Sequence, residues 1–337
     1  MAIRTEFLSV ASYAPPKVYT NDDLAEFMET SDEWIVQRTG IKKRRWIEGA
    51  TSTSDLAFEA SLKALEKAKV KKEELDAIFL ATLSPDHVFP GTACFLQKKL
   101  GVPGIPAFDI RQQCTGFIYA MSIADQYIRN GVYKKVLVVG SEVHSKALDR
   151  TTRGRDVTVL FGDGAGAAVL GAKEVIDSKT ESCLLSTHLH CDGEFAEELW
   201  VPAPGSGCGD HWCDEETYRS TKMFPQMNGK TVFIHAVKRM PEVIFEGLRA
   251  NQLTPADIDL FILHQANLRI NEMAAKALEV SPDKVFNTIE DYGNTTAATI
   301  PIGLDEAERA GRLKKGMLVA SAAFGSGFTW ASAIYRW

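Results

Sequence analysis

Three residues of this 337-residue chain, Cys114, His264 and Asn294, could together carry out acyl transfer through a thioester. A cysteine thiolate attacks a thioester carbonyl and forms a covalent acyl-enzyme. A neutral histidine and an asparagine amide can donate hydrogen bonds to the oxyanion or enolate that such a reaction forms. A lone cysteine is more often a small apolar core residue, and a lone histidine is usually structural. The hypothesis therefore depends on a fold that brings the three side chains together.

An internal repeat gives Cys114 and Asn294 equivalent positions in the chain. Residues 114–141 align with residues 294–321, and small and apolar residues recur at matching places. Such a duplication predicts two similar halves that pack against each other. The matched pairs include Asp125 with Asp305 and Gly131 with Gly311.

Each half has the same expected order of strand, loop, helix and strand. The short apolar segments 75–82 and 258–265 are typical of buried strands. The segments 115–130 and 295–310 are typical of helices that end at a glycine. This alternation indicates a sheet covered by helices, so we expect an α/β fold.

The expected elements place the candidate residues where chemistry is feasible. The two helices should begin at, or just after, Cys114 and Asn294, and the positive end of a helix dipole favours a thiolate. Pseudo-twofold symmetry would bring both side chains to one central site. His264 directly follows the second apolar strand, at its carboxyl end, where α/β sheets place their sites.

The composition excludes several classes of protein. With 45% apolar and 24% charged residues, the chain is neither disordered nor fibrous. No apolar run approaches the ~20 residues of a membrane span, and a net charge of −6 disfavours nucleic-acid binding. The first residues form no apolar signal segment, so we expect a cytoplasmic protein whose six cysteines are reduced thiols.

The segments around all three candidate residues resemble one family. Residues 109–117, 263–270 and 292–298 are similar to motifs of the β-ketoacyl-acyl-carrier-protein synthase III family, the initiating condensing enzymes of the thiolase fold. Similarity extends over nearly the whole chain, including residues 30–41, 161–168 and 323–330. The resemblance implies a thiolase-like, internally duplicated five-layer αβαβα architecture. Its halves would be residues 1–173, with the nucleophilic cysteine, and residues 174–337, with the histidine and the asparagine.

The resemblance also implies a two-step reaction that initiates fatty acid biosynthesis. Cys114 would take an acyl group from an acyl-CoA, while the backbone N–H groups of Cys114 and Ser326 hold the oxyanion. Malonyl-acyl-carrier protein would then lose CO2, and His264 and Asn294 would stabilise the enolate. The products would be 3-oxoacyl-acyl-carrier protein, CO2 and CoA, with no cofactor. Decarboxylation needs no strong base, and Phe324, where a thiolase would need a second cysteine, argues against a thiolase.

Family positions suggest how substrates and partners would bind. Trp34 would stack on the adenine of CoA, and Arg38 and Arg153 would pair with its phosphates. Without the resemblance, a surface pair explains Trp34 and Arg38 equally well. Arg269 would contact the acidic carrier protein, and Phe89 would reach the acyl pocket of the other subunit of a homodimer. The pantetheine channel would be lined by Met227, Gly229, Phe233, Ala266 and Asn267.

Two features near the family motifs bear on substrate and cofactor. Gln112 and Gln113 precede the nucleophile where small residues are common, and Thr115 follows it, so the acyl pocket could be reshaped. The acyl chain length therefore stays open. The glycines at 162, 164 and 166 resemble a dinucleotide loop but lack its strand and helix context, so close backbone packing is the preferred interpretation.

The segment 188–213 is longer than the usual family loop. Within it, Cys208, His211 and Cys213 are zinc-ligand types. Their spacing matches no known zinc knuckle, and the rest of the segment is rich in glycine, proline and acidic residues. We expect no metal, and bound zinc is kept as an alternative.

Three other functions remain open alongside the initiating condensation. A specialised relative could use the same three residues with a medium-chain donor or a CoA-linked acceptor in secondary metabolism. A protein that only binds acyl-CoA or a carrier protein could keep the fold, although it would not need Cys114, His264 and Asn294 together. A zinc-dependent hydrolase is the most distant alternative.

Overall fold

Each half of the chain builds one β-sheet in the computed structural model, which describes residues 2–337. The first sheet has the strand order β1 (Ala2–Tyr13), β7 (Gly164–Val175), β6 (Lys135–Glu142), β4 (Ala77–Ala81) and β5 (Ala107–Ile110). The second sheet has the order β11 (Leu260–Leu263), β12 (Leu318–Gly325), β13 (Thr329–Arg336) and β8 (Cys183–Cys191).

The two sheets share one pairing pattern. β4 runs parallel to β5 and β6, and β7 is antiparallel to β6 and β1. Likewise, β11 is parallel to β12, and β13 is antiparallel to β12 and β8. The counterpart of β5 is one parallel bridge between Phe261 and Val285. The expected division after residue 173 falls inside β7, and we propose that the halves divide in the turn 176–182.

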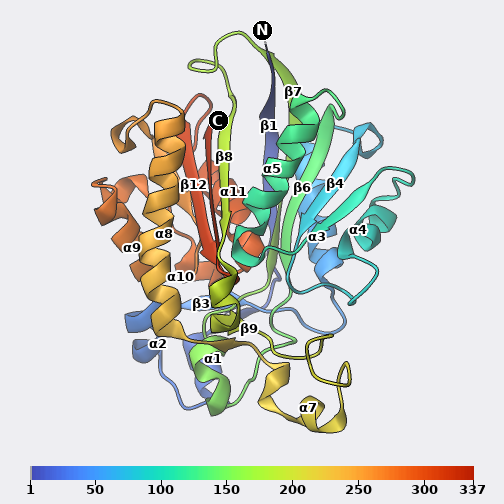
Figure 1. The fold of residues 1–337 in the computed structure, drawn as a ribbon, viewed down its shortest axis with the longest axis vertical. Helices are drawn as coiled ribbons and strands as arrows, with labels where there is room; N and C mark the ends of the chain where they lie inside the picture. Colours follow the sequence, from blue (N-terminus) through green and yellow to red (C-terminus); the bar gives the residue numbers. More distant parts are fainter. Residues whose placement is uncertain (1) are drawn as a thin grey trace.

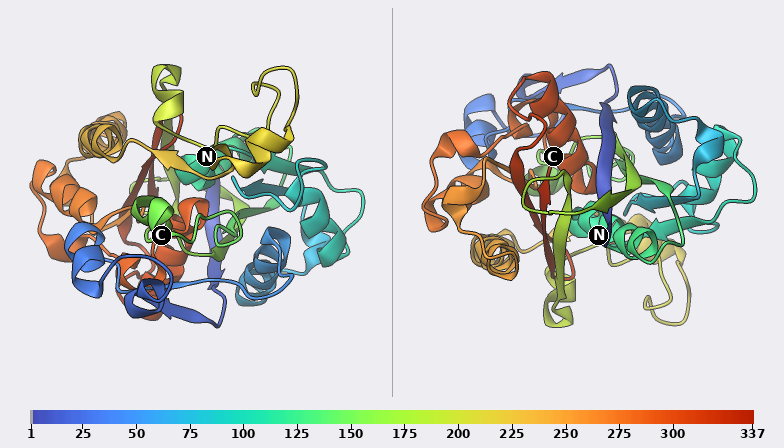
Figure 2. Two further views of the ribbon diagram at one scale, coloured as in Figure 1. Left: turned by 90° about the horizontal axis from the view of Figure 1, so that it is seen from below. Right: turned by 90° about the horizontal axis from the view of Figure 1, so that it is seen from above.

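Helices form three layers that alternate with the two sheets (Figures 1 and 2). The first sheet is covered on its outer face by α3 (Thr53–Ala68) and α4 (Thr92–Leu100), and the second by α8 (Gly229–Ala250) and α9 (Leu268–Ala277). Between the sheets lie α5 (Gly116–Arg129) and α11 (Thr299–Arg309). The predicted α/β class and the five-layer αβαβα arrangement are confirmed.

Small residues let the central helices approach the sheets closely. Every residue of β4 and of β11 is buried, because helices cover both faces of these strands. A Cβ atom on Gly140 would meet the carbonyl oxygen of Ala297, and one on Gly166 would lie 2.6 Å from Cβ of Pro301. The glycine motif at 162–166 therefore allows close backbone packing, as the sequence analysis preferred.

Helix α5 begins at Gly116, just after Cys114 as predicted, whereas α11 begins at Thr299, later than the predicted start just after Asn294. A 3-10 turn over Gln113–Thr115 precedes α5, and one over Thr296–Ala298 precedes α11. Both helices end at the predicted glycines, Gly131 with φ 73° and Gly311 with φ 69°, a conformation that glycine adopts readily. Cys114 therefore lies within a 3-10 turn and not at the first residue of an α-helix.

Shorter elements gather at the lower end of the molecule in Figure 1, where the carboxyl ends of the parallel strands lie. Residues 18–46 pack there against the second half of the chain, and the Lys42 N–H donates to the Glu290 carbonyl (3.0 Å). These elements are β2 (Val18–Thr20), α1 (Asn21–Ala25), α2 (Asp32–Thr39), β3 (Lys43–Arg45), α6 (Arg155–Thr158), β9 (Leu199–Trp200), α7 (Glu215–Arg219), β10 (Gln226–Met227) and α10 (Ile289–Tyr292).

Further 3-10 turns connect the main elements. They are Lys72–Glu74, Thr152–Gly154, Gly193–Glu198, Thr221–Met223, Pro255–Asp257 and Pro282–Lys284. Among residues 2–337, no helix combines the length and the apolar character needed to cross a membrane.

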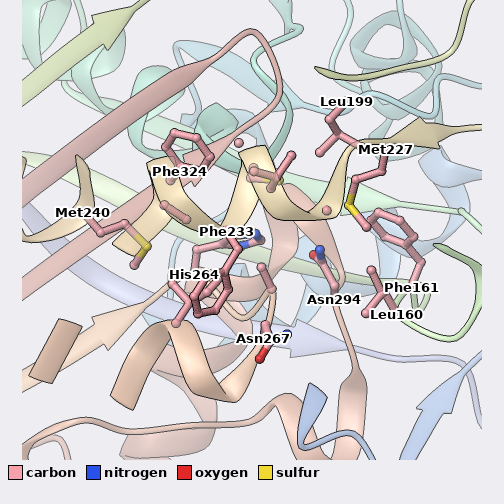
Figure 3. A pocket seen from close by; sticks show the side chains of 17 residues that line it. Leu160, Phe161, Leu199, Met227, Phe233, Met240, His264, Asn267, Asn294 and Phe324 are labelled. Atoms are coloured by element: carbon pink, nitrogen blue, oxygen red, sulfur yellow. The ribbon is translucent and has the colours of Figure 1, made fainter. Parts of the chain in front are cut away.

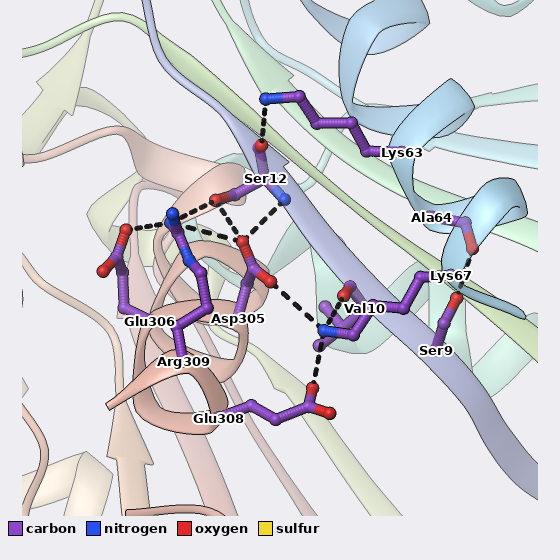
Figure 4. Close-up of polar contacts among 10 residues, drawn as sticks. All are labelled: Ser9, Val10, Ser12, Lys63, Ala64, Lys67, Asp305, Glu306, Glu308 and Arg309. Atoms are coloured by element: carbon purple, nitrogen blue, oxygen red, sulfur yellow. Dashed lines mark hydrogen bonds and ion pairs between the residues drawn. The ribbon is translucent and has the colours of Figure 1, made fainter. Parts of the chain in front are cut away.

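Buried aspartates tie both central helices to strand β1. Asp305 of α11 accepts hydrogen bonds from the Ser12 N–H (3.0 Å) and hydroxyl (2.7 Å), and Lys67 of α3 lies 3.4 Å away (Figure 4). The repeat-related Asp125 of α5 accepts a hydrogen bond from the Thr5 hydroxyl (2.7 Å). One strand therefore holds the two helices that follow the candidate residues Cys114 and Asn294 in the chain.

We expect Asp305→Ala to lower the free energy of unfolding by about 1–3 kcal/mol, because the buried Ser12 donors lose their acceptor. Glu308→Ala is the matched control, since Glu308 pairs with the same Lys67 at a more exposed position and should cost less than about 1 kcal/mol. Urea unfolding measures both values. Equal losses in the two variants would contradict the role assigned to Asp305.

Candidate active site

Cys114 is buried in the turn between β5 and α5. The residue before it, Gln113, has φ 44°, and Gly293, which precedes Asn294 in the repeat, has φ 63°. A left-handed conformation is rare for a residue with a side chain and is typical of functional sites. Both candidate residues therefore directly follow a residue with positive φ.

The end of β12 packs directly on the nucleophile. A Cβ atom on Gly325 would lie 2.6 Å from Cβ of Cys114 and 2.9 Å from its sulfur, so only glycine fits there. The backbone N–H groups of Cys114 and Ser326 both lie close enough to the thiol to lower its pKa. This places the two predicted oxyanion-hole groups beside the sulfur.

The Cys114 thiol is protonated in the free protein, contrary to the expectation of a thiolate at a helix N-terminus. Burial raises the pKa of the thiol to about 12, and the negative charge of Glu142 acts in the same direction. Burial also raises the pKa of Glu142 to about 7, although Thr82, Leu83 and Ser84 donate hydrogen bonds to its carboxylate. Desolvation therefore outweighs the favourable backbone groups around the sulfur.

His264 lies directly after β11, as predicted, and presents one ring nitrogen to the site. Its backbone N–H donates to the Ala322 carbonyl (2.8 Å), and its Nδ1 is 2.8 Å from the Thr299 hydroxyl. Within residues 2–337, its buried Nε2 has no hydrogen-bond partner. Burial lowers the pKa of His264 to about 3, so the ring is neutral at physiological pH.

Asn294 is fixed by the first half of the chain. Its N–H donates to the Leu160 carbonyl (2.8 Å), and its own carbonyl accepts from the Gly162 N–H (3.0 Å). Its side-chain Oδ1 accepts a hydrogen bond from the Thr296 N–H (2.8 Å). Because the oxygen is occupied, the Nδ2 group is the end that can donate to a ligand.

One pocket brings the three candidate residues together with the predicted channel residues (Figure 3). It has an empty volume of about 660 Å³, its open mouth included. Cys114, His264 and Asn294 share its wall with Met227, Gly229, Phe233, Ala266 and Asn267. The sequence analysis missed Leu160, Phe161, Leu199, Val232, Ala236, Met240 and Ile270, which also line it and which look like ordinary core residues in the sequence.

An aromatic and basic cluster adjoins the pocket. Two arginines lie over the ring of Trp34 on α2. The guanidinium carbon of Arg38 is 4.4 Å from the ring centroid, and that of Arg155 is 4.6 Å from it. Asn267, which lines the pocket, donates from Nδ2 to the Arg38 carbonyl (2.9 Å). Trp34 and Arg38 are therefore linked to the pocket, and Arg155, missed in the sequence, joins them.

Arg153 occupies a different position from Arg155. It forms an ion pair with Asp149 (2.6 Å), and its guanidinium carbon lies 5.8 Å from the ring centroid of Phe224. The sequence analysis assigned the phosphate contact to Arg153 and did not consider Arg155, on the other side of Gly154. In the structure, Arg155 lies over the ring of Trp34, whereas Arg153 forms an ion pair with the carboxylate of Asp149.

The expected partner contacts lie on the surface. The guanidinium carbon of Arg269, in the first turn of α9, lies 5.9 Å from the ring centroid of Phe233, which lines the pocket. Phe89 is 83% exposed on the segment between β4 and α4. Both side chains are thus available to another protein surface.

The cysteine- and histidine-containing segment shows no metal centre. Among residues 2–337, no three histidine, cysteine, aspartate or glutamate side chains are grouped so as to hold a metal ion. Cys208 contacts the Pro202 carbonyl (3.1 Å), and Cys213 contacts the Asp214 carbonyl (3.7 Å). The arrangement gives no support to the zinc alternative.

The raised pKa of Cys114 predicts slow reaction with a neutral haloacetamide near pH 7, increasing about tenfold per pH unit between pH 8 and 10. Glu142→Gln should accelerate alkylation at pH 8–9, because it removes a carboxylate that is ionised above pH 7 and raises the thiol pKa. Mass spectrometry measures the rate, with Cys114→Ala identifying the site. A rate that levels off near neutral pH, or slower alkylation of Glu142→Gln, would refute this account.

Comparisons with known proteins agree with this geometry. Family models described as 3-oxoacyl-[acyl-carrier-protein] synthase III and its C-terminal part match residues 108–193 and 248–337. A β-ketoacyl-[acyl-carrier-protein] synthase III from Xanthomonas euvesicatoria is 46% identical, covering 99% of both chains. A solved 3-oxoacyl-[acyl-carrier-protein] synthase III from Aquifex aeolicus has a TM-score of 0.88 and 40% identity, covering 99% of this chain and 100% of that one.

A priming β-ketosynthase from the R1128 polyketide pathway has a similar structure, with a TM-score of 0.89. It is 30% identical and covers 99% of this chain and 97% of that one. The full-length similarity to the synthases is therefore stronger in sequence, and it confirms the thiolase-like fold. This chain belongs to the β-ketoacyl-[acyl-carrier-protein] synthase III family.

Proposed function

We propose that this enzyme condenses an acyl-CoA with malonyl-acyl-carrier protein and so initiates fatty acid biosynthesis. The products are 3-oxoacyl-acyl-carrier protein, CO2 and CoA. One observation carries the proposal: the Cys114 thiol, the unpaired Nε2 of neutral His264 and the amide of Asn294 line one pocket. A nucleophile and two neutral donors are what a decarboxylative condensation requires.

In the first half-reaction, the sulfur of Cys114 forms a bond to the thioester carbonyl carbon of the acyl-CoA. The backbone N–H groups of Cys114 and Ser326 donate hydrogen bonds to the developing oxyanion. The bond from carbon to the CoA sulfur then breaks, and the thiol proton leaves with CoA. Burial suits the acyl-enzyme, because a thioester is neutral and needs no compensating charge.

In the second half-reaction, the malonyl thioester oxygen accepts hydrogen bonds from His264 Nε2–H and Asn294 Nδ2. The bond between the α-carbon and the carboxylate carbon breaks, and CO2 leaves. The electron pair of that bond stays on the α-carbon and forms the enolate. The enolate carbon forms a bond to the acyl carbonyl carbon, and the Cys114 sulfur leaves as a thiolate that takes up a proton from the solvent. His264 donates as a neutral ring, which is consistent with its low pKa.

The same pocket residues bind the pantetheine arm of both substrates. Met227, Gly229, Phe233, Ala266 and Asn267 line the pantetheine channel of CoA and of the carrier protein. At its mouth, Trp34 stacks on adenine and the arginines pair with phosphates, with Arg155 added to the predicted Arg38 and Arg153. Arg269 contacts the acidic carrier protein.

We further propose a homodimer in which Phe89 enters the acyl pocket of the other subunit. An apolar ring that is 83% exposed is costly in water and favourable in a subunit interface. The edge strand β5 has one free side in the single chain and can pair with a second copy. The cytoplasmic location and the absence of a cofactor stay predictions from the sequence.

The specialised alternative has less support. The relatives at 44–46% identity over the full chain carry the name β-ketoacyl-[acyl-carrier-protein] synthase III, whereas the polyketide priming enzyme is 30% identical. A protein that only binds acyl-CoA would not need the unpaired His264 nitrogen beside a buried thiol. The initiating condensation is therefore the function that the site and the relatives favour.

Intact-protein mass spectrometry after mixing with acetyl-CoA should show one added acyl group, and Cys114→Ala should show none. His264→Ala and Asn294→Ala should still load the acyl group, but formation of 3-oxoacyl-acyl-carrier protein should fall about 10²–10³-fold, since each variant removes one donor to the enolate. Butyryl-, octanoyl- and branched acyl-CoAs define the preferred chain. No loading with any donor would leave the binding-only alternative ahead.

Arg155→Ala should raise the KM for acyl-CoA about 5–30-fold with little change in kcat, because it removes a charged contact to CoA beside Trp34. Arg153→Ala is the matched control and should have the smaller effect, since Asp149 already neutralises that guanidinium. Steady-state kinetics with acetyl-CoA test the pair. A larger effect from Arg153→Ala would reverse the assignment.

A further inference from the structure

Thr296 contacts one catalytic donor, Asn294, and also Thr299, the hydrogen-bond partner of the other donor, His264. The Thr296 N–H donates to Oδ1 of Asn294 (2.8 Å), and the Thr296 carbonyl oxygen lies 3.0 Å from the Thr299 hydroxyl. The same Thr299 hydroxyl lies 2.8 Å from Nδ1 of His264. All these groups are buried, so no water competes for them.

The third polar group of Thr296 reaches a histidine in the other half of the chain. Its hydroxyl lies 2.7 Å from Nε2 of His144, which follows β6 in the first half. The His144 ring also packs against Phe161, with ring centroids 4.6 Å apart, and Phe161 lines the active-site pocket. His144 takes no part in the proposed chemistry.

Thr296 also has an unusual backbone conformation, with φ 49°. β-branched residues rarely adopt left-handed angles, so surrounding contacts must hold it there. This conformation aims its N–H at Asn294 while its carbonyl meets Thr299. Among the side-chain hydrogen bonds of Thr296 within residues 2–337, the one with His144 comes from outside its own turn.

The hydroxyl of Thr299 also bears on the tautomer of His264. It has one proton, which can go to the Thr296 carbonyl or to Nδ1 of His264. Donation to Nδ1 leaves the His264 proton on Nε2, the nitrogen that faces the pocket without a partner. The Thr296 carbonyl therefore competes for the proton that sets this tautomer.

We propose that Thr296, anchored by His144, is a positioning residue that orients Asn294 and His264 as one unit for the decarboxylation step. This inference rests on the proposed function. The anchor lies in the half that carries the nucleophile, and the two donors lie in the other half. The pair thus couples the second half-reaction to the packing between halves. The groups that donate to the Cys114 thiol are the backbone N–H groups of Cys114 and Ser326, and they belong to neither Thr296 nor His144.

The test separates the two half-reactions. Thr296→Val keeps the side-chain shape but loses the hydroxyl, and His144→Leu removes the anchor from the other side. Both should slow CO2 release from malonyl-acyl-carrier protein by preformed acyl-enzyme about 10–100-fold, since a small misplacement of catalytic groups has effects of this size. Loading of Cys114 by acetyl-CoA should stay within about threefold of wild type.

Matched variants keep the outcome decisive. Thr296→Ser and His144→Gln retain a hydrogen-bonding group and should keep decarboxylation within about threefold of wild type. Thr295→Val is the control, because among the described residues the neighbouring Thr295 hydroxyl is buried without a hydrogen-bond partner. Thermal unfolding identifies any variant that fails to fold. If Thr296→Val does not fold, His144→Leu tests the same contact from the other side.

The inference is overturned if Thr296→Val and His144→Leu release CO2 at the wild-type rate, or if acyl loading and CO2 release fall together. It is also overturned if the conservative variants show the same loss as the disruptive ones. A wild-type enzyme that neither loads an acyl group nor releases CO2 would instead refute the proposed function. The two failures are therefore distinguishable.

Discussion

The active site depends on the backbone contact between the Asn294 turn and the segment that leads into β7. Asn294 donates to the Leu160 carbonyl and accepts from the Gly162 N–H, so a residue of the second half is held by backbone bonds of the first. Two peptide hydrogen bonds satisfy the buried polar groups on both sides of this contact. The approach is possible because Gly293 and Gly162 have no Cβ atoms: one on Gly293 would lie 2.9 Å from the Leu160 carbonyl oxygen, and one on Gly162 would collide with the Tyr292 carbonyl oxygen.

Desolvation determines the chemistry that this contact makes available. Burial keeps His264 and His144 neutral and raises the pKa of the Cys114 thiol. A site of neutral groups cannot remove a proton from carbon by strong-base chemistry, but it can stabilise an enolate made by loss of CO2. Decarboxylation, which generates the carbanion without a base, is thus the reaction that suits a buried pocket of neutral groups.

Much of this site could be predicted because its residues carry chemistry that recurs at matched positions. The repeat predicted that Cys114 and Asn294 occupy equivalent positions, and each directly follows a residue with positive φ, Gln113 and Gly293. The ionisation state of Cys114 was predicted wrongly. A helix dipole acts locally and is visible in the sequence, whereas burial and the charge of Glu142 come from distant segments.

The sequence by itself determined the fold class and the duplicated halves, and it predicted Cys114, His264 and Asn294 as the candidate nucleophile and donors, because local patterning and reactive residue types are properties of short segments. Only the tertiary structure decided that Arg155, and not Arg153, joins Trp34, and that His144 contacts Thr296. These choices arise where segments far apart in the chain meet. Packing between them sets which of several chemically similar side chains comes within reach, and no local pattern encodes that distance.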